Sequence, residues 1–194
     1  MPRSTRAKTE VEQAAIELFA ARGIDGVSIG EIAALAGVSQ GALYRHYASK
    51  EDLARTLFTT AYRRTGAELG EIRARMRGFR ARITAMVGHF CALYDADAAL
   101  FRFLLLAQHN FLPHLGDAPD YPPAVIGQVV AEGIEAGELP RIDPALGAAV
   151  IMGVVLQTAT FHLYGRITGP LADRADLLAR AAVTAVQALG ESRP

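Results

Sequence analysis

The sequence predicts an all-helical protein in which a small N-terminal domain precedes a larger helical domain. Apolar residues recur at intervals of three and four along most of the chain, which is the period of an amphipathic helix. No segment shows the strict alternation of a half-buried strand. Hydrophobic residues make up 51% of the 194 residues. This share is sufficient for a buried core and argues against a wholly disordered chain.

The first predicted helix carries an apolar stripe at positions i, i+3, i+4, i+7 and i+8. The residues of this stripe are Val11, Ala14, Ala15, Leu18 and Phe19. Gly23 follows where a helix commonly ends, so we expect the helix to stop close to it.

Two short helices follow, and each begins after a serine. Ser28 and Glu31 have the spacing of a capping box, which opens a helix. Gly37 stops that helix, because a turn residue at positive φ is most easily a glycine. Ser39 caps the next helix, which is predicted over residues 40–45.

The glycine turn at residues 36–39 joins these two helices in the arrangement of a helix-turn-helix. The turn has to be compact so that the helices cross at a fixed angle. We expect Ile32, Ala33 and Val38 to face inward and hold this angle. Leu35 and Leu43 are expected to lock the two helices to the first helix. The outer face of the third helix can then enter a DNA major groove, which is wide enough to admit it.

Helical patterns continue through the rest of the chain. Ser49 caps a fourth helix, whose first turn holds Glu51 and Asp52 where the helix dipole favours acids. Prolines and glycines mark a loop at residues 113–123. Further helices are predicted at residues 83–94, 100–108, 125–136, 144–165 and 173–189.

The segment Ala145–Gly165 has no charged residue and is long enough to span a membrane. It contains polar residues such as Gln157 and His162, and its flanks lack the basic and aromatic anchors of a membrane helix. A helix that is apolar on nearly every side is also typical of burial between neighbours or in a subunit interface. We therefore expect burial and no membrane contact.

Charge is distributed unevenly along the chain. Residues 1–82 carry 14 Lys and Arg against 9 Asp and Glu, whereas residues 83–194 carry 6 against 11. A basic front half suggests that this part of the chain meets a polyanion. We interpret one run of arginines instead as a solvated helix face, namely Arg73, Arg75, Arg77, Arg80 and Arg82.

Several classes of protein are disfavoured. The single Cys91 excludes an internal disulfide and a multi-cysteine zinc site, and we expect it to be buried and unreactive. His89, His109 and His114 lack a metal-binding spacing, so we expect no metal. No glycine-rich phosphate loop or Ser-His-Asp grouping supports an enzyme. The polar residues 1–12 do not resemble a secretory signal, so we expect a cytoplasmic protein.

The segment SIGEIAALAGVSQGALYRHYASKEDL, residues 28–53, resembles the DNA-binding signature of the tetracycline-repressor (TetR) family of bacterial transcription regulators. The similarity extends upstream through residues 14–28. The resemblance implies an all-α homodimer with an N-terminal three-helix DNA-binding domain and a helical C-terminal ligand-binding and dimerisation domain. We place the division at residue 48, which gives domains of residues 1–48 and 49–194.

The resemblance assigns phosphate contacts to Tyr44, His46 and Lys50, whose donors and charge suit that role. Ser28 and Ser39 lie at helix N-termini, where backbone N–H groups also favour an anion. Taken alone, Tyr44 would rather indicate a packing residue and His46 a solvated turn residue, whereas the full signature favours DNA contact for both.

Base contacts are expected from the third helix. Gln40 is the best base reader, since its amide can pair bidentately with adenine. Gly41 allows the backbone close to the DNA, and the Ala42 methyl can meet a thymine methyl. Arg45 is expected at a phosphate or a guanine edge. Gly30 departs from the family pattern, because several members carry a basic, base-contacting residue there, so we expect poorer readout from the second helix.

Three basic residues near the N-terminus, Arg3, Arg6 and Lys8, form an arm that either follows a DNA groove or is a disordered tail.

The family analogy implies a pocket for a small-molecule effector among the C-terminal helices, although a single residue of this kind is more often part of the core than a ligand contact. The candidates are Met86, His89, Phe90, Tyr94, Phe103, Gln108, His109, Phe111, Phe161 and His162. Their mixture suggests a mostly apolar or aromatic ligand that carries a hydrogen-bonding group. No other cofactor is expected.

The functional hypothesis is a homodimeric repressor on a pseudo-palindromic operator of double-stranded DNA. The dimer would form through the last two helices and place two recognition helices about 34 Å apart. A ligand would shift the helix that begins at Lys50 and so release the operator. Alternatives are an activator, a regulator that ignores ligand, or a ligand-sensing module that acts through protein partners.

Overall fold

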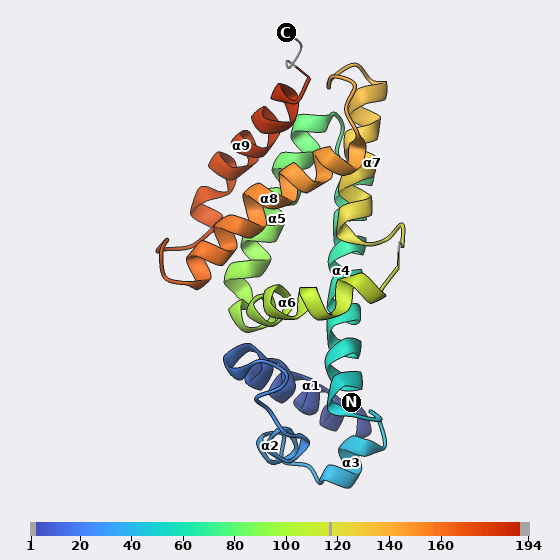
Figure 1. Ribbon diagram of the computed structural model, residues 1–194, viewed down its shortest axis with the longest axis vertical. Coiled ribbons are helices and arrows are strands. Elements are labelled where there is room, and N and C mark those ends of the chain that lie inside the picture. Colours follow the sequence, from blue (N-terminus) through green and yellow to red (C-terminus); the bar gives the residue numbers. More distant parts are fainter. Residues whose placement is uncertain (1–2, 117, 191–194) are drawn as a thin grey trace. The chain divides into compact units, whose positions relative to one another are not determined.

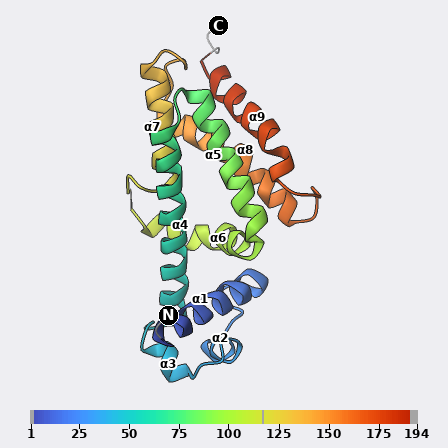
Figure 2. The same ribbon diagram turned by 180° about the vertical axis from the view of Figure 1, so that it is seen from behind.

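The computed structural model describes residues 3–116 and 118–190, and these residues form nine α-helices and no strand (Figures 1 and 2). The helices are α1 (Arg3–Arg22), α2 (Ile29–Leu35), α3 (Gln40–Tyr44), α4 (Lys50–Arg75), α5 (Phe79–Ala96), α6 (Ala98–Phe111), α7 (Pro122–Glu135), α8 (Pro144–Leu163) and α9 (Ala175–Ala188). Two short 3-10 helices cover Leu112–His114 and Ala172–Arg174. The prediction of an all-helical protein is confirmed.

The chain divides into two compact units. The N-terminal unit comprises Met1–Ala61 and Asp97–Gly116, and the C-terminal unit comprises Tyr62–Ala96 and Asp117–Pro194. The division falls within α4, and it assigns α6 to the N-terminal unit.

The N-terminal unit is built around α1, which packs against both α2 and α6 (Figure 1). The Phe19 ring stacks on the Phe103 ring of α6, with the two centroids 5.8 Å apart. Phe58 of α4 meets Phe111 at the end of α6, with centroids 5.4 Å apart. Aromatic pairs of this kind add about 0.5–1.5 kcal/mol beyond the area that they bury. They fix α6 to the helices of the predicted DNA-binding segment.

The sequence signals at helix ends explain where several elements begin. Asp97 accepts a hydrogen bond from the Leu100 N–H at 2.9 Å and so caps α6, which starts earlier than predicted. α7 begins at Pro122, also before the predicted start, because the first turn of a helix needs no N–H from proline. Pro144 occupies the same kind of position in α8, as predicted.

The C-terminal unit is a layered helical bundle. α5 runs beside α9, and α8 packs against α7 and α9 (Figures 1 and 2). Its core consists of fully buried aliphatic side chains, among them Ile83, Val129, Val130, Val183 and Val186. α7 and α8 approach closely at Gly147, where a Cβ atom would lie 2.8 Å from a methyl group of Val130.

Polar contacts fix the connection between α8 and α9 to the end of α5. The Tyr94 hydroxyl lies 3.1 Å from Nδ1 of His162. The Asp95 carboxylate accepts hydrogen bonds from the N–H groups of Leu171 at 3.0 Å and Ala172 at 2.8 Å. Asp95 therefore satisfies backbone donors that the bend before α9 leaves without a helical partner.

Among the described residues, α8 is the one helix whose length and composition would allow it to cross a membrane, with a mean hydropathy of 1.6 over 18 residues. Only 28% of that window is buried within one chain. One face of α8 packs on α7 and α9, and the opposite face presents residues such as Leu146 and Phe161 to the surface.

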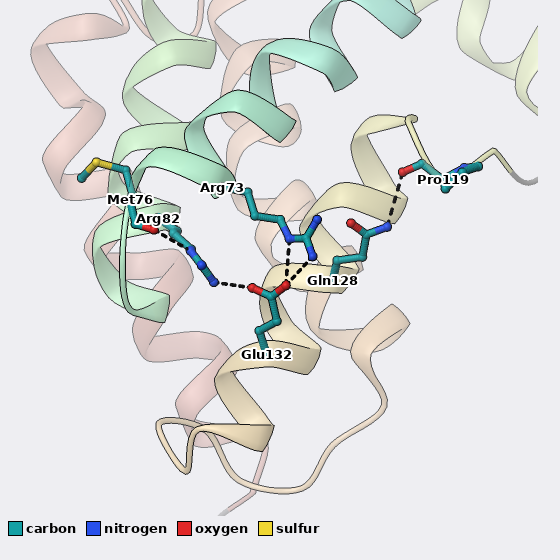
Figure 3. Close-up of polar contacts among 6 residues, drawn as sticks. All are labelled: Arg73, Met76, Arg82, Pro119, Gln128 and Glu132. Atoms are coloured by element: carbon teal, nitrogen blue, oxygen red, sulfur yellow. Dashed lines mark hydrogen bonds and ion pairs between the residues drawn. The ribbon is translucent and has the colours of Figure 1, made fainter.

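Glu132 of α7 joins three helices of the C-terminal unit (Figure 3). Its carboxylate accepts hydrogen bonds from the Arg73 guanidinium of α4, including one from Nε at 3.0 Å, and from the Arg82 guanidinium of α5. Arg82 also donates from Nε to the Met76 carbonyl at 3.1 Å. The solvated-face interpretation is therefore wrong for Arg73 and Arg82. The acid that pairs with them is some 50 to 59 residues away, so helical spacing gives no sign of it.

We predict that Glu132→Gln lowers the free energy of unfolding by about 1–2 kcal/mol, because two guanidinium groups lose their charged acceptor at a half-buried site. Urea denaturation at pH 7 measures the change. Glu135→Gln, on the exposed surface of the same helix, is the control and should have little effect.

The loss of stability in Glu132→Gln should also depend on pH, in a direction that the pKa of Glu132 determines. The hydrogen bond from Arg73 holds the pKa of Glu132 below its ordinary value of 4.5. The stabilisation is therefore complete above pH 4.5 and is lost as the pH falls through the lower pKa of the folded state. The difference between wild type and Glu132→Gln should shrink on acidification. An equal difference at pH 7 and in strong acid would contradict the assignment.

Candidate nucleic-acid interface

α2 begins with the predicted capping box. The Ser28 hydroxyl oxygen accepts from the Glu31 N–H at 3.3 Å, and the Glu31 carboxylate accepts from the Ser28 N–H at 2.8 Å. Arg22, at the end of α1, donates to the same carboxylate at 2.7 Å. This hydrogen bond and those from Ser28 lower the pKa of Glu31 to about 2. The start of α2 is thereby tied to the end of α1, a contact that the sequence pattern did not indicate.

The turn between α2 and α3 is as compact as predicted. Gly37 has φ +67°, a conformation that side chains other than glycine rarely adopt. The Val38 N–H donates to the Ala33 carbonyl at 3.0 Å, which closes the end of α2. Ser39 then caps α3, and its hydroxyl oxygen accepts from the Ala42 N–H at 3.2 Å.

The inner faces of the two helices hold most of the expected residues. Ile32, Ala33 and Leu43 are buried, and Val38 is half-buried. The prediction for Leu35 is wrong, because its side chain is 54% exposed.

The geometry of α2 explains the error at Leu35. The buried stripe of this seven-residue helix runs through Ile29, Ile32, Ala33 and Ala36. With about 100° per residue, position 35 falls well outside the arc that these four residues cover. Ala36, after the last helical residue, occupies the inward position that was expected for Leu35.

The predicted DNA contacts form a largely exposed surface around α3. Ala42 and Lys50 are half-buried, and all the other members of the set are exposed. The set consists of Ser28, Ser39, Gln40, Gly41, Ala42, Tyr44, Arg45, His46 and Lys50. The Tyr44 ring is 54% exposed, whereas the nearby Tyr47 is buried and donates its hydroxyl hydrogen to Glu12 at 2.9 Å. Tyr47, rather than Tyr44, is therefore the tyrosine that packs into the core here.

The phosphate-contact candidates Ser28, Tyr44 and Lys50 line one open surface depression, between the start of α2 and the start of α4. Asp25 and Glu51 line it too, and the Lys50 ammonium lies 3.8 Å from the Glu51 carboxylate. The depression therefore holds both signs of charge. The base-reading candidates lie outside it, on the outer face of α3.

The N-terminal arm is partly described. α1 begins at Arg3, so the backbone of this segment is helical. Lys8 lies 3.8 Å from Glu12, one turn along the same helix. The side chains of Arg3 and Arg6 lie outside the described part of the chain.

The effector candidates fall into two groups. In the C-terminal unit, the Tyr94 ring meets His162 edge-on with centroids 5.3 Å apart, and Phe90 lies 6.5 Å from Tyr94. His89 pairs with Glu68 at 3.1 Å. Of the two remaining candidates of this unit, Met86 is buried in α5, whereas Phe161 is 47% exposed on α8.

The other candidates belong to α6 and the N-terminal unit. Phe103 and Phe111 pack on Phe19 and Phe58. Gln108 donates to the Leu105 carbonyl at 3.1 Å, and His109 is exposed. The structure thus gives core partners to the two phenylalanines, and within the C-terminal unit it brings together Phe90, Tyr94 and His162.

Cys91 is fully buried, as predicted, and burial raises the pKa of its thiol to about 11. Within the described residues, no group of three His, Cys, Asp or Glu side chains is placed to hold a metal ion.

Comparison with known proteins agrees with this geometry. The family model for bacterial regulatory proteins of the tetR family matches residues 13–57, which run from the middle of α1 to the first turns of α4. The chain is 25% identical over 169 residues to the HTH-type transcriptional regulator SrpR of Pseudomonas putida, covering 80% of this chain and 76% of that protein. It is 24% identical over 156 residues to the fatty acid metabolism regulator protein of Bacillus subtilis, covering 78% and 80%.

The fold is shared with solved regulators. The transcriptional regulator FadR from Bacillus subtilis, crystallised with stearoyl-CoA, superimposes with a TM-score of 0.77 at 18% identity, covering 91% of this chain and 98% of that one. The relatives named here are transcription regulators rather than enzymes. The family match lies on the helix-turn-helix itself, and the structural match extends over both units. The helix-turn-helix of residues 13–57 is that of the tetR family of bacterial regulatory proteins, and the chain is a DNA-binding transcription regulator.

Proposed function

We propose that the chain is a homodimeric repressor, acting in the cytoplasm, that binds a pseudo-palindromic operator and releases it when a small molecule binds. Residues 1–48 would form the DNA-binding domain, with Lys50 at the start of α4 adding a further phosphate contact, and residues 49–194 would otherwise carry the ligand and dimer functions. The observation that carries the proposal is the exposed outer face of α3, held at a fixed angle by a buried inner face. A recognition helix presented in this way fits a major groove.

The contacts divide into those that position the protein and those that read sequence. Tyr44, His46 and Lys50 would anchor phosphates, with the backbone N–H groups near Ser28 and Ser39. Because the depression that holds Tyr44 and Lys50 also contains Asp25 and Glu51, its affinity for phosphate depends on the Lys50 ammonium.

The reading contacts would come from Gln40, Gly41, Ala42 and Arg45. Gln40 and Arg45 are exposed and carry the donors that major-groove base edges accept. Gly41 has no atom within 4 Å of the place where a Cβ would lie, so this part of α3 is open to a close approach of DNA.

Two substitutions separate positioning from reading. Lys50→Ala should weaken binding to all duplexes and reduce the slope of log affinity against log salt by about one for each phosphate that the variant no longer binds. Gln40→Ala should relax the preference at one base position in each half-site, at a cost of about 1–3 kcal/mol. Selection from a randomised duplex library followed by fluorescence anisotropy measures both effects.

Gln13→Ala is the control, since Gln13 is an exposed glutamine on α1 that hydrogen-bonds Glu17. An unchanged base preference in Gln40→Ala would refute the reading role. Failure of the wild-type chain to select any duplex would refute the proposed function and favour a sensing module that acts through protein partners.

A homodimer through α8 and α9 is supported by the exposed apolar face of these helices. Leu146 and Phe161 of α8 and Leu177 of α9 are 49%, 47% and 57% exposed. Ala149 and Gly153 lie on the same face of α8, and small residues there allow a second helix to approach closely. Large apolar side chains that gather on exposed helix faces are typical of a protein interface.

Gly153→Arg should convert the dimer to a monomer. A Cβ at Gly153 would meet nothing within 4 Å in one chain, so the fold should tolerate the new side chain while a facing helix would not. Sedimentation velocity measures the mass. Gly70→Arg is the matched control, because Gly70 is also helical and open. A Gly153→Arg protein that stays dimeric would place the interface elsewhere.

The ligand is proposed to combine a long apolar part with a polar head. The suggestion is supported by the fatty acid metabolism regulator among the relatives and by the stearoyl-CoA bound to the structural neighbour. α4 contributes Lys50 to the N-terminal unit and Arg73 to the C-terminal unit, so a ligand-induced movement of this helix would alter the DNA-contact residues. A ligand that prefers the altered state weakens DNA binding by its differential affinity.

Stearoyl-CoA should lower the affinity of the chain for its selected duplex by roughly 5- to 150-fold, the usual range of coupling between two sites. Anisotropy of a labelled duplex, titrated with stearoyl-CoA and with free coenzyme A as the control, tests this. Binding of stearoyl-CoA without any change in duplex affinity would contradict ligand release. The absence of binding would contradict this ligand class.

A further inference from the structure

Gly30 of α2 lies directly against the side chain of Gln40 of α3. A Cβ atom placed on Gly30 would be 3.0 Å from Nε2 of Gln40 and 3.8 Å from its Cδ. The Ser28 hydroxyl oxygen lies 3.8 Å from the same point. The Gln40 carboxamide therefore rests on bare backbone in the first turn of α2, beside the capping serine.

The closeness of Gly30 and Gln40 results from the compact turn between α2 and α3. Ser39 caps α3, so Gln40 is its first residue, and the turn at Gly37 brings that residue back to the start of α2. The neighbouring Gly41 shows the contrast, because a Cβ there would have no atom within 4 Å. Of these two glycines, only Gly30 leaves a space that a neighbouring side chain, that of Gln40, occupies.

A glutamine side chain free in solvent samples many rotamers, and fixing it on binding costs about 0.5–1.5 kcal/mol. A carboxamide that already rests against α2 loses less freedom when it meets a base. It also presents its donor and acceptor in a restricted set of directions, which a bidentate contact requires.

We propose that Gly30 is a specificity-determining residue that positions the Gln40 carboxamide for reading a base pair. Gly30 itself does not touch the base. Any side chain at position 30 moves the carboxamide by a few tenths of an ångström or forces another rotamer. This inference rests on the proposed DNA-reading role of Gln40.

The experiment is a double-mutant cycle between Gly30→Ala and Gln40→Ala in the full-length chain. The probes are the duplex that the wild-type chain selects from a randomised library and a set of duplexes that differ from it at single base pairs. Discrimination is the ratio of affinities for the selected and the substituted base at the position that Gln40→Ala relaxes. Gly30→Ala should reduce this ratio by about three- to tenfold. In the Gln40→Ala background it should have no effect.

Thermal unfolding separates positioning from a structural role. Alanine favours a helix more than glycine does, so Gly30→Ala should not lower Tm although it lowers discrimination. Gly70→Ala is the control, since this helical glycine has open space around it and should leave discrimination unchanged.

The outcomes distinguish the inference from the proposed function. If the wild-type chain selects no duplex, DNA reading fails and the inference fails with it. If the wild type selects a duplex but the two substitutions act independently, only the inference is overturned. An equal loss of affinity for all duplexes in Gly30→Ala, retained in the Gln40→Ala background, would also overturn it. That pattern would mean that the lack of a side chain at Gly30 allows the DNA backbone to approach α2 closely, without orienting Gln40.

Discussion

The crossing of α2 and α3 is fixed by a small buried contact and one backbone conformation. Ile32 and Leu43 are almost completely buried, and Gly37 turns the chain between them at φ +67°. Because α2 has seven residues and α3 has five, neither would be stable alone. The exposed face of α3, the position of Gln40 against Gly30 and the depression beside Lys50 all depend on this contact.

Different kinds of long-range contact stabilise the two units. In the N-terminal unit, aromatic pairs such as Phe19 with Phe103 connect helices that are far apart in sequence. In the C-terminal unit, aliphatic packing is supplemented by the Glu132 carboxylate, which binds arginines of two other helices. Shape complementarity and charge pairing thus supply the long-range contacts, and the local caps define where each helix begins.

Local physics accounts for what could be predicted from the sequence. The Ser28–Glu31 capping box, the Ser39 cap and the turn at Gly37 involve residues within a few positions of one another, and each appears where expected. Leu35 was wrongly expected to face inward because the pattern of a seven-residue helix leaves its buried arc poorly defined.

What could not be predicted is non-local. The ion pairs between Glu132 and Arg73 or Arg82 depend on the packing of three helices. The spacing of these residues in the sequence does not indicate that packing. The contact between Gly30 and Gln40 is similar, since it arises from the return of α3 to the start of α2. The surface of the recognition helix was predictable from the motif, whereas the neighbours that orient its side chains were not.

The buried thiol of Cys91 gives the molecule an internal reporter. It is the single cysteine of the chain, it has no exposed surface, and burial raises its pKa to about 11. A thiol reagent can reach it only when α5 separates from its neighbours, and only the thiolate reacts. The rate of labelling therefore measures how often the middle of this helix opens, without any engineered probe.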